Sequence, residues 1–139
     1  MKQVSPEEAF GMMEKEGYVY VDVRSVAEFG AGHPADAFNV PLLDMTPRGM
    51  APNPDFMSVM AKGFAKDAKL IVGCKSGGRS LHAVQLLEAA GYQDVVLQRC
   101  GYDGAPDPLG RFEPGWKPKG LPTSQEAAPE RTYAGLKGQ

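Results

Sequence analysis

Short apolar runs alternate with amphipathic stretches along most of the chain. Four runs are rich in β-branched and aromatic residues and predict strands: 18–23, 37–40, 70–73 and 95–97. Apolar residues at helical spacing predict three helices and one shorter helical turn: 6–16, 55–65, 81–90 and 26–29. Because strands alternate with helices, the pattern predicts an α/β fold around a mostly parallel sheet.

The first predicted helix has the clearest end signals. Ser5 stands where an N-cap is needed, Pro6 takes the first helical position, and Glu8 completes a capping box. Asp55 is a candidate cap for the helix at 55–65. The stretch 42–54 holds three prolines and a glycine, so it is predicted to be a loop.

The composition changes after residue 100. Glycine, proline and charged residues dominate 101–120, where Phe112 and Trp116 are the large apolar anchors. We expect this stretch to wrap over the sheet without forming a second domain. From residue 124 onward the residues are small and polar, which predicts a frayed end. The predicted organisation is therefore one domain at 1–123 and a polar tail at 124–139.

Composition and charge exclude several classes of protein. The chain of 139 residues is 42% hydrophobic and 23% charged, as expected for one globular domain. Its net charge of −2 gives no reason to expect nucleic acid or an anionic membrane as a partner. The first residues do not resemble a signal peptide, and no apolar run is long enough to span a bilayer, so we expect a soluble cytoplasmic protein. Two cysteines and two histidines match no common metal-ligand spacing.

The candidate chemistry lies in residues 74–80, between a predicted strand and a predicted helix. Glycines at a strand-to-helix turn let several backbone N–H groups point at one place, and the helix dipole adds positive potential there. Cys74, the first residue of this loop, is therefore expected to be largely thiolate near neutral pH. Lys75 and Arg79 add positive charge for an anionic substrate. The sequence predicts Cys74 as a catalytic nucleophile beside an anion site.

The predicted substrate-binding positions are the rest of this loop: Lys75, Ser76, Gly77, Gly78, Arg79 and Ser80. Arg79 is the favoured anion-binding side chain, whereas Lys75 fits a solvated lysine equally well. The two glycines meet a backbone need, either a positive φ or close approach of substrate. The two serines have two candidate roles, capping N–H groups or donating to sulfur, and for Ser80 the structural role is favoured.

The chain resembles the single-domain rhodaneses, a sulfurtransferase family, over roughly residues 4 to 123. The resemblance rests on stretches in the family's order: Tyr20–Arg24 with Glu28-Phe29 and Gly32-His33, Ala37–Leu42, Cys74–Ser80, and Gly101-Tyr102 with Trp116. It implies a rhodanese-like fold whose central sheet has helices on both faces. Three departures from the family pattern are visible. Pro34 stands where the family usually has a β-branched residue, and Cys100 replaces the first of two glycines. The insertion Asp103–Gly115 could reshape the rim of the site or decorate the surface.

The resemblance also implies a reaction. The Cys74 thiolate would take the sulfane sulfur of thiosulfate or a similar donor, releasing sulfite and leaving a persulfide on Cys74. Cyanide or a thiol would then accept the sulfur, and a sulfur-carrier protein is a further candidate partner. No metal or organic cofactor is implied.

The other polar residues have structural interpretations. We expect His33 and His82 to be packed or solvated, and Asp22 and Arg24 to form a buried network that includes Glu28. Cys100 could resolve the persulfide as a disulfide, but a passive thiol is the favoured interpretation.

Two alternatives remain open. A cysteine-dependent phosphatase or arsenate reductase also places cysteine and arginine around an anion, but its arginine follows the cysteine by six positions. Arg79 follows Cys74 by five positions, which favours a smaller reacting centre such as one sulfur atom. The second alternative is a non-catalytic rhodanese-like module that binds or senses, although the nucleophile is retained.

Overall fold

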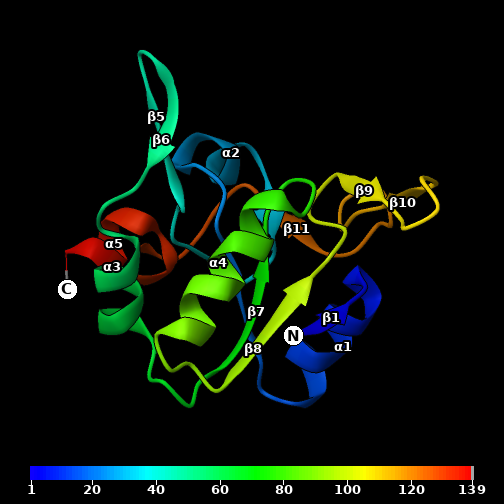
Figure 1. Ribbon diagram of the computed structural model, residues 1–139, viewed down its shortest axis with the longest axis horizontal. Coiled ribbons are helices and arrows are strands. Elements are labelled where there is room, and N and C mark those ends of the chain that lie inside the picture. Colours follow the sequence, from blue (N-terminus) through cyan, green and yellow to red (C-terminus); the bar gives the residue numbers. More distant parts are fainter. Residues whose placement is uncertain (139) are drawn as a thin grey trace.

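A five-stranded sheet forms the centre of the computed structural model, which describes residues 1–138 (Figure 1). The strand order is β1-β8-β7-β2-β4, and every neighbouring pair is parallel. The strands are β1 (Lys2–Val4), β2 (Val19–Asp22), β4 (Phe38–Asn39), β7 (Lys69–Gly73) and β8 (Asp94–Gln98). The predicted α/β class and parallel sheet are confirmed.

Helices cover both faces of this sheet, as expected. One face carries α3 (Phe56–Gly63), α4 (Gly78–Ala89) and α5 (Tyr133–Lys137), and the other carries α1 (Pro6–Lys15) and α2 (Val26–Ala31). Successive side chains of a strand point to opposite faces. In β7, accordingly, Leu70 and Val72 belong to the first core cluster and Ile71 to the second.

Two helices begin with the same local device. The predicted capping box is present at α1, where Ser5 and Glu8 each accept a backbone N–H from the other. Ser25 and Glu28 form a second capping box at α2. Asp55 occupies the N-cap position of α3, but its carboxylate pairs with Lys137 and does not cap, so the predicted side-chain cap is wrong.

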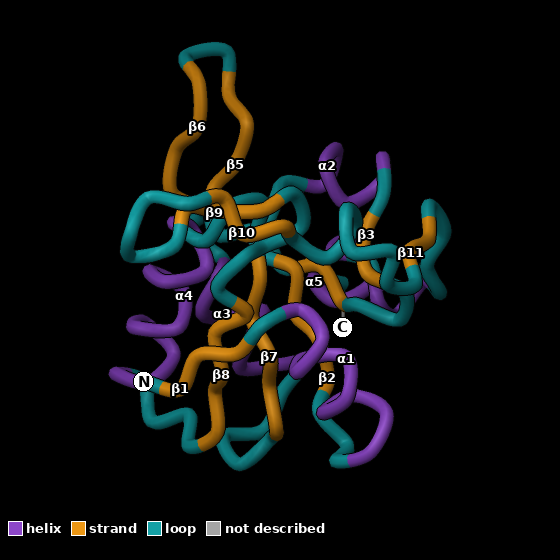
Figure 2. The backbone as a smooth tube through the Cα atoms, turned by 90° about the vertical axis from the view of Figure 1, so that its right-hand side faces the viewer, coloured by secondary structure: helices purple, strands orange, loops and turns teal. Residues whose placement is uncertain are grey.

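The stretch 42–54 is not the loop that its prolines predict. It forms a hairpin of β5 (Leu43–Thr46) and β6 (Gly49–Pro52), which stands away from the sheet (Figure 2). Proline is tolerated at the margin of such a two-stranded hairpin because no third strand needs its missing N–H. Gly49 takes a positive φ of 103° directly after the turn, which suits a glycine.

Residues 124–138 fold back against the domain, so the expectation of fraying is wrong for this part of the tail. β11 (Thr123–Ser124) pairs with β3 (His33–Pro34), and the 3-10 helix η1 (Pro129–Arg131) leads into α5. Leu136 of α5 is 3% exposed and packs beside Gly63 of α3. Leu136, the partly buried Tyr133 and the pairing of β11 with β3 together hold the tail on the domain.

The segment after β8 wraps over the sheet, as predicted, but only one of its two expected anchors is buried. Trp116 is fully buried and packs edge-on against Phe10 and Tyr20. Phe112 is 66% exposed, so that part of the prediction is wrong. The insertion forms a second hairpin of β9 (Gly104–Pro106) and β10 (Phe112–Pro114). Among the helices of residues 1–138, none is both long enough and apolar enough to cross a membrane.

Candidate active site

Cys74 lies between the end of β7 and the start of α4, at the carboxyl edge of the parallel sheet. Helix α4 begins at Gly78, three residues before the predicted start, so the loop is a short turn followed by a helix N-terminus. Gly77 takes a left-handed φ of 102°, and a Cβ there would lie 2.9 Å from the carbonyl oxygen of Arg99. Both observations require glycine at this position.

Two backbone N–H groups and one hydroxyl group surround the Cys74 sulfur. The backbone N–H of Gly77 lies 3.1 Å from Sγ and that of Ser80 lies 3.3 Å from it, and the Ser80 hydroxyl oxygen is 3.3 Å away. These N–H groups belong to the N-terminus of α4, where orphan donors and the helix dipole favour negative charge. Both N–H groups, those of Gly77 and Ser80, are directed at the cysteine sulfur.

The Ser80 hydroxyl can serve either protonation state of the cysteine. It lies 3.0 Å from the carbonyl oxygen of Gly77, to which it donates. With that bond made, its oxygen is free to accept from a Cys74 thiol, and after deprotonation the hydroxyl can turn and donate to the sulfur. Ser80 is fully buried, so the favoured structural role and the contact with sulfur coincide in one side chain.

Cys74 is also almost completely covered. The residue is 2% exposed and belongs to the core cluster that includes Val72 and Ala83. A reactive cysteine needs partial access to solvent. The Cys74 sulfur therefore has little direct access to solvent, and the turn of residues 75–79 covers it.

The guanidinium of Arg79, at the end of this turn, is paired with a carboxylate. Its two terminal nitrogens donate to the Glu28 carboxylate at 2.7 and 3.0 Å, and the side chains are 17% and 27% exposed. The hydrogen bonds from Arg79, with help from the backbone of Ser25, lower the pKa of Glu28 to about 2. The carboxylate therefore stays charged at neutral pH and offsets the charge of Arg79.

The remaining predicted substrate-binding residues lie around the turn. Lys75 and Ser76 are exposed, and the Lys75 ammonium is 4.0 Å from the carboxylate of Asp103. Both partners are more than half exposed, so this pair contributes little. Gly78 is the first residue of α4, and nothing lies within 4 Å of the position of a Cβ there, so the geometry does not demand glycine.

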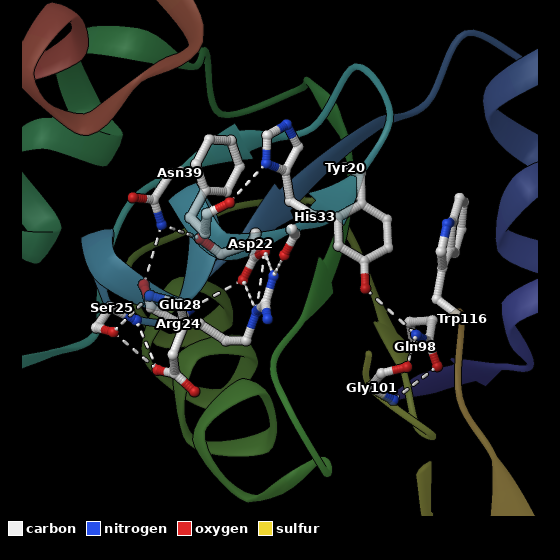
Figure 3. Close-up of polar contacts among 12 residues, drawn as sticks. Tyr20, Asp22, Arg24, Ser25, Glu28, His33, Asn39, Gln98, Gly101 and Trp116 are labelled. Atoms are coloured by element: carbon white, nitrogen blue, oxygen red, sulfur yellow. Dashed lines mark hydrogen bonds and ion pairs between the residues drawn. The ribbon is translucent and has the colours of Figure 1, made fainter. Parts of the chain in front are cut away.

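A buried ion pair, Asp22–Arg24, lies at the carboxyl end of β2, the strand next to β7. The Arg24 guanidinium donates twice to the Asp22 carboxylate and once, at 2.7 Å, to the carbonyl oxygen of Gly32 (Figure 3). Asn39 donates to the carbonyl oxygens of Asp22 and Arg24. The predicted Asp22–Arg24 network is confirmed, but Glu28 belongs to Arg79 instead, so its predicted membership is wrong.

The two histidines lie outside the reacting centre. His33 is 1% exposed, stacks on Phe29 at 3.7 Å, and contacts backbone carbonyl oxygens through both ring nitrogens. His82 is exposed on α4. These positions agree with the structural interpretation of both. Within residues 1–138, no group of His, Cys, Asp and Glu side chains is placed to hold a metal ion.

Cys100 is a free, fully buried thiol. Burial, together with the Glu113 carboxylate, raises the pKa of this thiol to about 11. A thiol that remains protonated at neutral pH is a poor nucleophile. The geometry therefore favours the passive interpretation of Cys100.

The insertion is connected to the turn through its base. The N–H of Tyr102 donates to the carbonyl oxygen of Cys74 at 2.7 Å, and that of Asp103 donates to Lys75 at 3.0 Å. The first residue of the insertion is thus hydrogen-bonded to the Cys74 turn.

Gln98 is a supporting residue that the sequence reasoning missed. It is fully buried, and its side-chain oxygen accepts the N–H groups of Cys100 and Gly101, which fixes the segment beside the turn. The available signal was a single amide side chain at the end of an apolar strand.

Comparisons with known proteins assign the family. Residues 5–105 match the family described as "Rhodanese-like domain". The chain belongs to the rhodanese-like family. It is 39% identical over 107 residues to "Thiosulfate sulfurtransferase 16, chloroplastic" of Arabidopsis thaliana, covering 77% of this chain and 80% of that protein.

A second relative is matched over a shorter length. The rhodanese-like chain is 41% identical over 86 residues to "Protein HIGH ARSENIC CONTENT 1, mitochondrial" of Arabidopsis thaliana. The match covers 62% of this chain and about half, 51%, of that protein.

Solved structures share the rhodanese-like fold. The M. tuberculosis protein Rv0390 superposes with a TM-score of 0.73 at 26% identity, covering 91% of this chain and 98% of that one. A rhodanese-related protein from Thermoplasma volcanium has a TM-score of 0.60 at 22% identity and supports the fold alone, covering 91% of this chain and 100% of that one.

Proposed function

We propose that the protein is a sulfurtransferase that carries sulfane sulfur as a persulfide on Cys74. The observation that carries this proposal is the Cys74 sulfur held by two N–H groups at the N-terminus of α4, with the Ser80 hydroxyl 3.3 Å away. The family assignment and the relative named thiosulfate sulfurtransferase support the reaction class.

The proposed reaction has two steps. The Cys74 thiolate attacks the outer sulfur of a donor such as thiosulfate, the sulfur–sulfur bond of the donor breaks, and sulfite leaves with the bonding electron pair. The N–H groups of Gly77 and Ser80 then stabilise the negative charge of the persulfide. Cyanide or a thiol takes the outer sulfur in the second step and restores the Cys74 thiolate.

The surrounding residues have proposed positioning roles. The backbone of residues 75–78 provides the turn through which the donor approaches, with the Ser76 hydroxyl and the Lys75 ammonium at its exposed rim. The guanidinium of Arg79 would contact an anionic sulfur donor through the N–H groups that do not bind Glu28. A thiol-bearing sulfur-carrier protein is a further proposed acceptor.

The phosphatase or arsenate reductase alternative is less well supported. A tetrahedral oxyanion needs several donors for its oxygen atoms. Here the N–H groups of Gly77 and Ser80 are directed at the cysteine sulfur, and Arg79 is paired with Glu28. A non-catalytic module would need neither a helix N-terminus behind the sulfur nor a cysteine there.

One experiment separates these functions. The protein is incubated with thiosulfate, and its intact mass is measured before and after a reductant. Addition of one sulfur atom, removed by the reductant and absent in Cys74→Ser, is the expected result. Turnover of an aryl phosphate or of arsenate without a sulfur adduct would contradict the proposal in favour of the phosphatase class, and no reaction at all would leave a binding module.

We propose a cytoplasmic location on chemical grounds. A persulfide carrier needs a compartment in which thiols stay reduced, and both cysteines are free. The relatives named above are chloroplastic and mitochondrial by name, so imaging of a tagged full-length protein in its own cells is the direct test.

A further inference from the structure

A small cavity of about 190 Å³ lies between helix α2 and the tail of the chain. Phe29, His33 and Asn39 form the buried part of its lining and are 5%, 1% and 1% exposed. The tail contributes Ala127, and no residue of the Cys74 turn lines the cavity. A cavity of about 150 Å³ is large enough to hold benzene. This cavity therefore has room for a single six-membered ring.

Asn39 brings an unpaired acceptor to this cavity. Its side-chain nitrogen donates to the carbonyl oxygens of Asp22 and Arg24, both at 3.0 Å, which fixes the orientation of the amide. The oxygen Oδ1 therefore points away from these two residues (Figure 3). It exposes less than 1 Å² and has no hydrogen-bond partner. Since a buried acceptor without a partner keeps its desolvation penalty, a ligand that donates to Oδ1 gains affinity.

The other groups of the lining favour an apolar molecule with a single donor. Within residues 1–138, the lining includes no Asp, Glu, Lys or Arg, so an ion would find no opposite charge. Both ring nitrogens of His33 contact carbonyl oxygens, and the Thr132 hydroxyl donates to another. The Tyr133 hydroxyl accepts from Asn53 at 3.0 Å. A buried water typically makes about three hydrogen bonds, and the Asn39 oxygen offers one.

The wall formed by the tail is the part of the cavity that can adjust to a ligand. Thr132 and Ala134 line the cavity at the start of α5. This helix has five residues, of which Leu136 is the buried one. A short helix with few buried contacts opens locally at low cost in free energy. Because Oδ1 is covered in the structure, a small shift of this wall lets the donor of a ligand reach it.

We propose that this cavity binds a small uncharged molecule with an apolar ring and one hydroxyl group, a phenol, whose hydroxyl donates to Oδ1 of Asn39. The ring would lie against Phe29 and Ala127, where it buries apolar surface. The site is independent of the proposed function, because it uses neither Cys74 nor the turn that follows it.

The test compares two ring compounds of similar size, of which only one has a donor. Phenol and fluorobenzene are titrated into protein that is labelled with ¹³C at the alanine methyl groups. Phenol is expected to shift the NMR resonances of Ala127 and Ala134 in a saturable way and to leave that of Ala89, an exposed residue of α4, unchanged. Its Kd should be about fivefold lower than that of fluorobenzene, because only phenol donates to the unpaired oxygen. Equal or weaker binding of phenol would overturn the assignment of Oδ1, and no saturable shift with phenol would overturn the site.

Two neighbouring alanines give a matched pair of variants. Ala127→Leu places three more carbon atoms in the cavity, so the Kd for phenol should rise tenfold or more. Ala128→Leu is the control, because Ala128 is exposed and does not line the cavity, and its Kd should equal that of the wild type. Ala134→Leu gives a second blocking variant at an exposed position, where added bulk does not threaten folding. Wild-type affinity in both blocking variants contradicts the proposal.

Discussion

Arg24–Asp22 and Arg79–Glu28 are two of the arginine–carboxylate pairs near the carboxyl edge of the sheet, and they differ in burial and in what they hold together. Arg24 and Asp22 are two residues apart, and their side chains are 5% and 2% exposed. Arg79 and Glu28 join α4 to α2 across fifty-one positions of sequence, and their side chains are 17% and 27% exposed. Both pairs join a guanidinium to a carboxylate, but their surroundings differ.

The buried pair acts as scaffold. Arg24 also donates to the carbonyl oxygen of Gly32 and lies 4.3 Å above the ring of Tyr102, so it joins three segments of the chain. The partly exposed pair lies beside the Cys74 turn, because Arg79 belongs to the first turn of α4. This difference predicts that loss of the first pair mainly lowers stability and that loss of the second mainly changes the charge beside Cys74.

The largest expected effect comes from breaking the buried pair. Asp22→Ala leaves the Arg24 guanidinium buried without its carboxylate, and such a loss typically costs about 3–5 kcal/mol. Urea denaturation of Asp22→Ala and Arg79→Ala gives the comparison. Removing Arg79 is expected to cost about 1 kcal/mol because water reaches that pair. Equal losses of unfolding free energy in the two variants would contradict the division between scaffold and site.

The second prediction concerns charge at the opening. Glu28→Gln keeps a side chain that can complete the capping box of α2 but removes the charge that offsets Arg79. Thiosulfate should then load Cys74 faster, by about fivefold, because the guanidinium becomes available to a dianion. The rate is measured by intact mass at low and high salt, and the gain should shrink at high salt. An unchanged or lower rate at low salt would show that the pair does not limit thiosulfate.

How far the sequence anticipates these features depends on the range of the interaction. The capping box of Ser5 and Glu8 is predictable because its bonds join residues three apart. The Cys74 turn is predictable because it is local: the glycines that follow the cysteine allow a tight turn between the strand and the helix. The partner of Arg79 is not predictable in this way, since nothing local to α4 marks Glu28 as the carboxylate that folding brings to it.

The errors in secondary structure have a similar origin. The hairpin of β5 and β6 has strands of four residues, which is too short for a clear alternation of apolar and polar positions. Helix α5 has five residues, and its place depends on Leu136 meeting α3, which is a tertiary contact. The exposure of Phe112 follows from the hairpin that carries it, not from its type.

The third prediction uses the two capping boxes as a matched pair. Ser25→Ala and Ser5→Ala each remove one N-cap hydroxyl, and each is expected to cost about 1 kcal/mol of unfolding free energy. Only Ser25 also donates to the carboxylate that holds Arg79. Ser25→Ala should therefore change the rate of thiosulfate loading about twofold or more, whereas Ser5→Ala should not. If both variants load sulfur at the wild-type rate, the capping box of α2 has no influence on the site.

The smallest expected effect is the acid response of the partly exposed pair. Arg79 lowers the pKa of Glu28 to about 2 in the folded protein, below about 4.3 for an unfolded glutamate. The pair's stabilisation is therefore fully present above about pH 4.3 and is lost as the pH falls toward 2. Because water reaches the pair, we expect about 1 kcal/mol from it. The wild type should lose more unfolding free energy between pH 5 and pH 3 than Glu28→Gln loses. The difference between the two losses should be about 1 kcal/mol. An identical pH response in the two proteins would mean that the carboxylate gains nothing from Arg79 on folding.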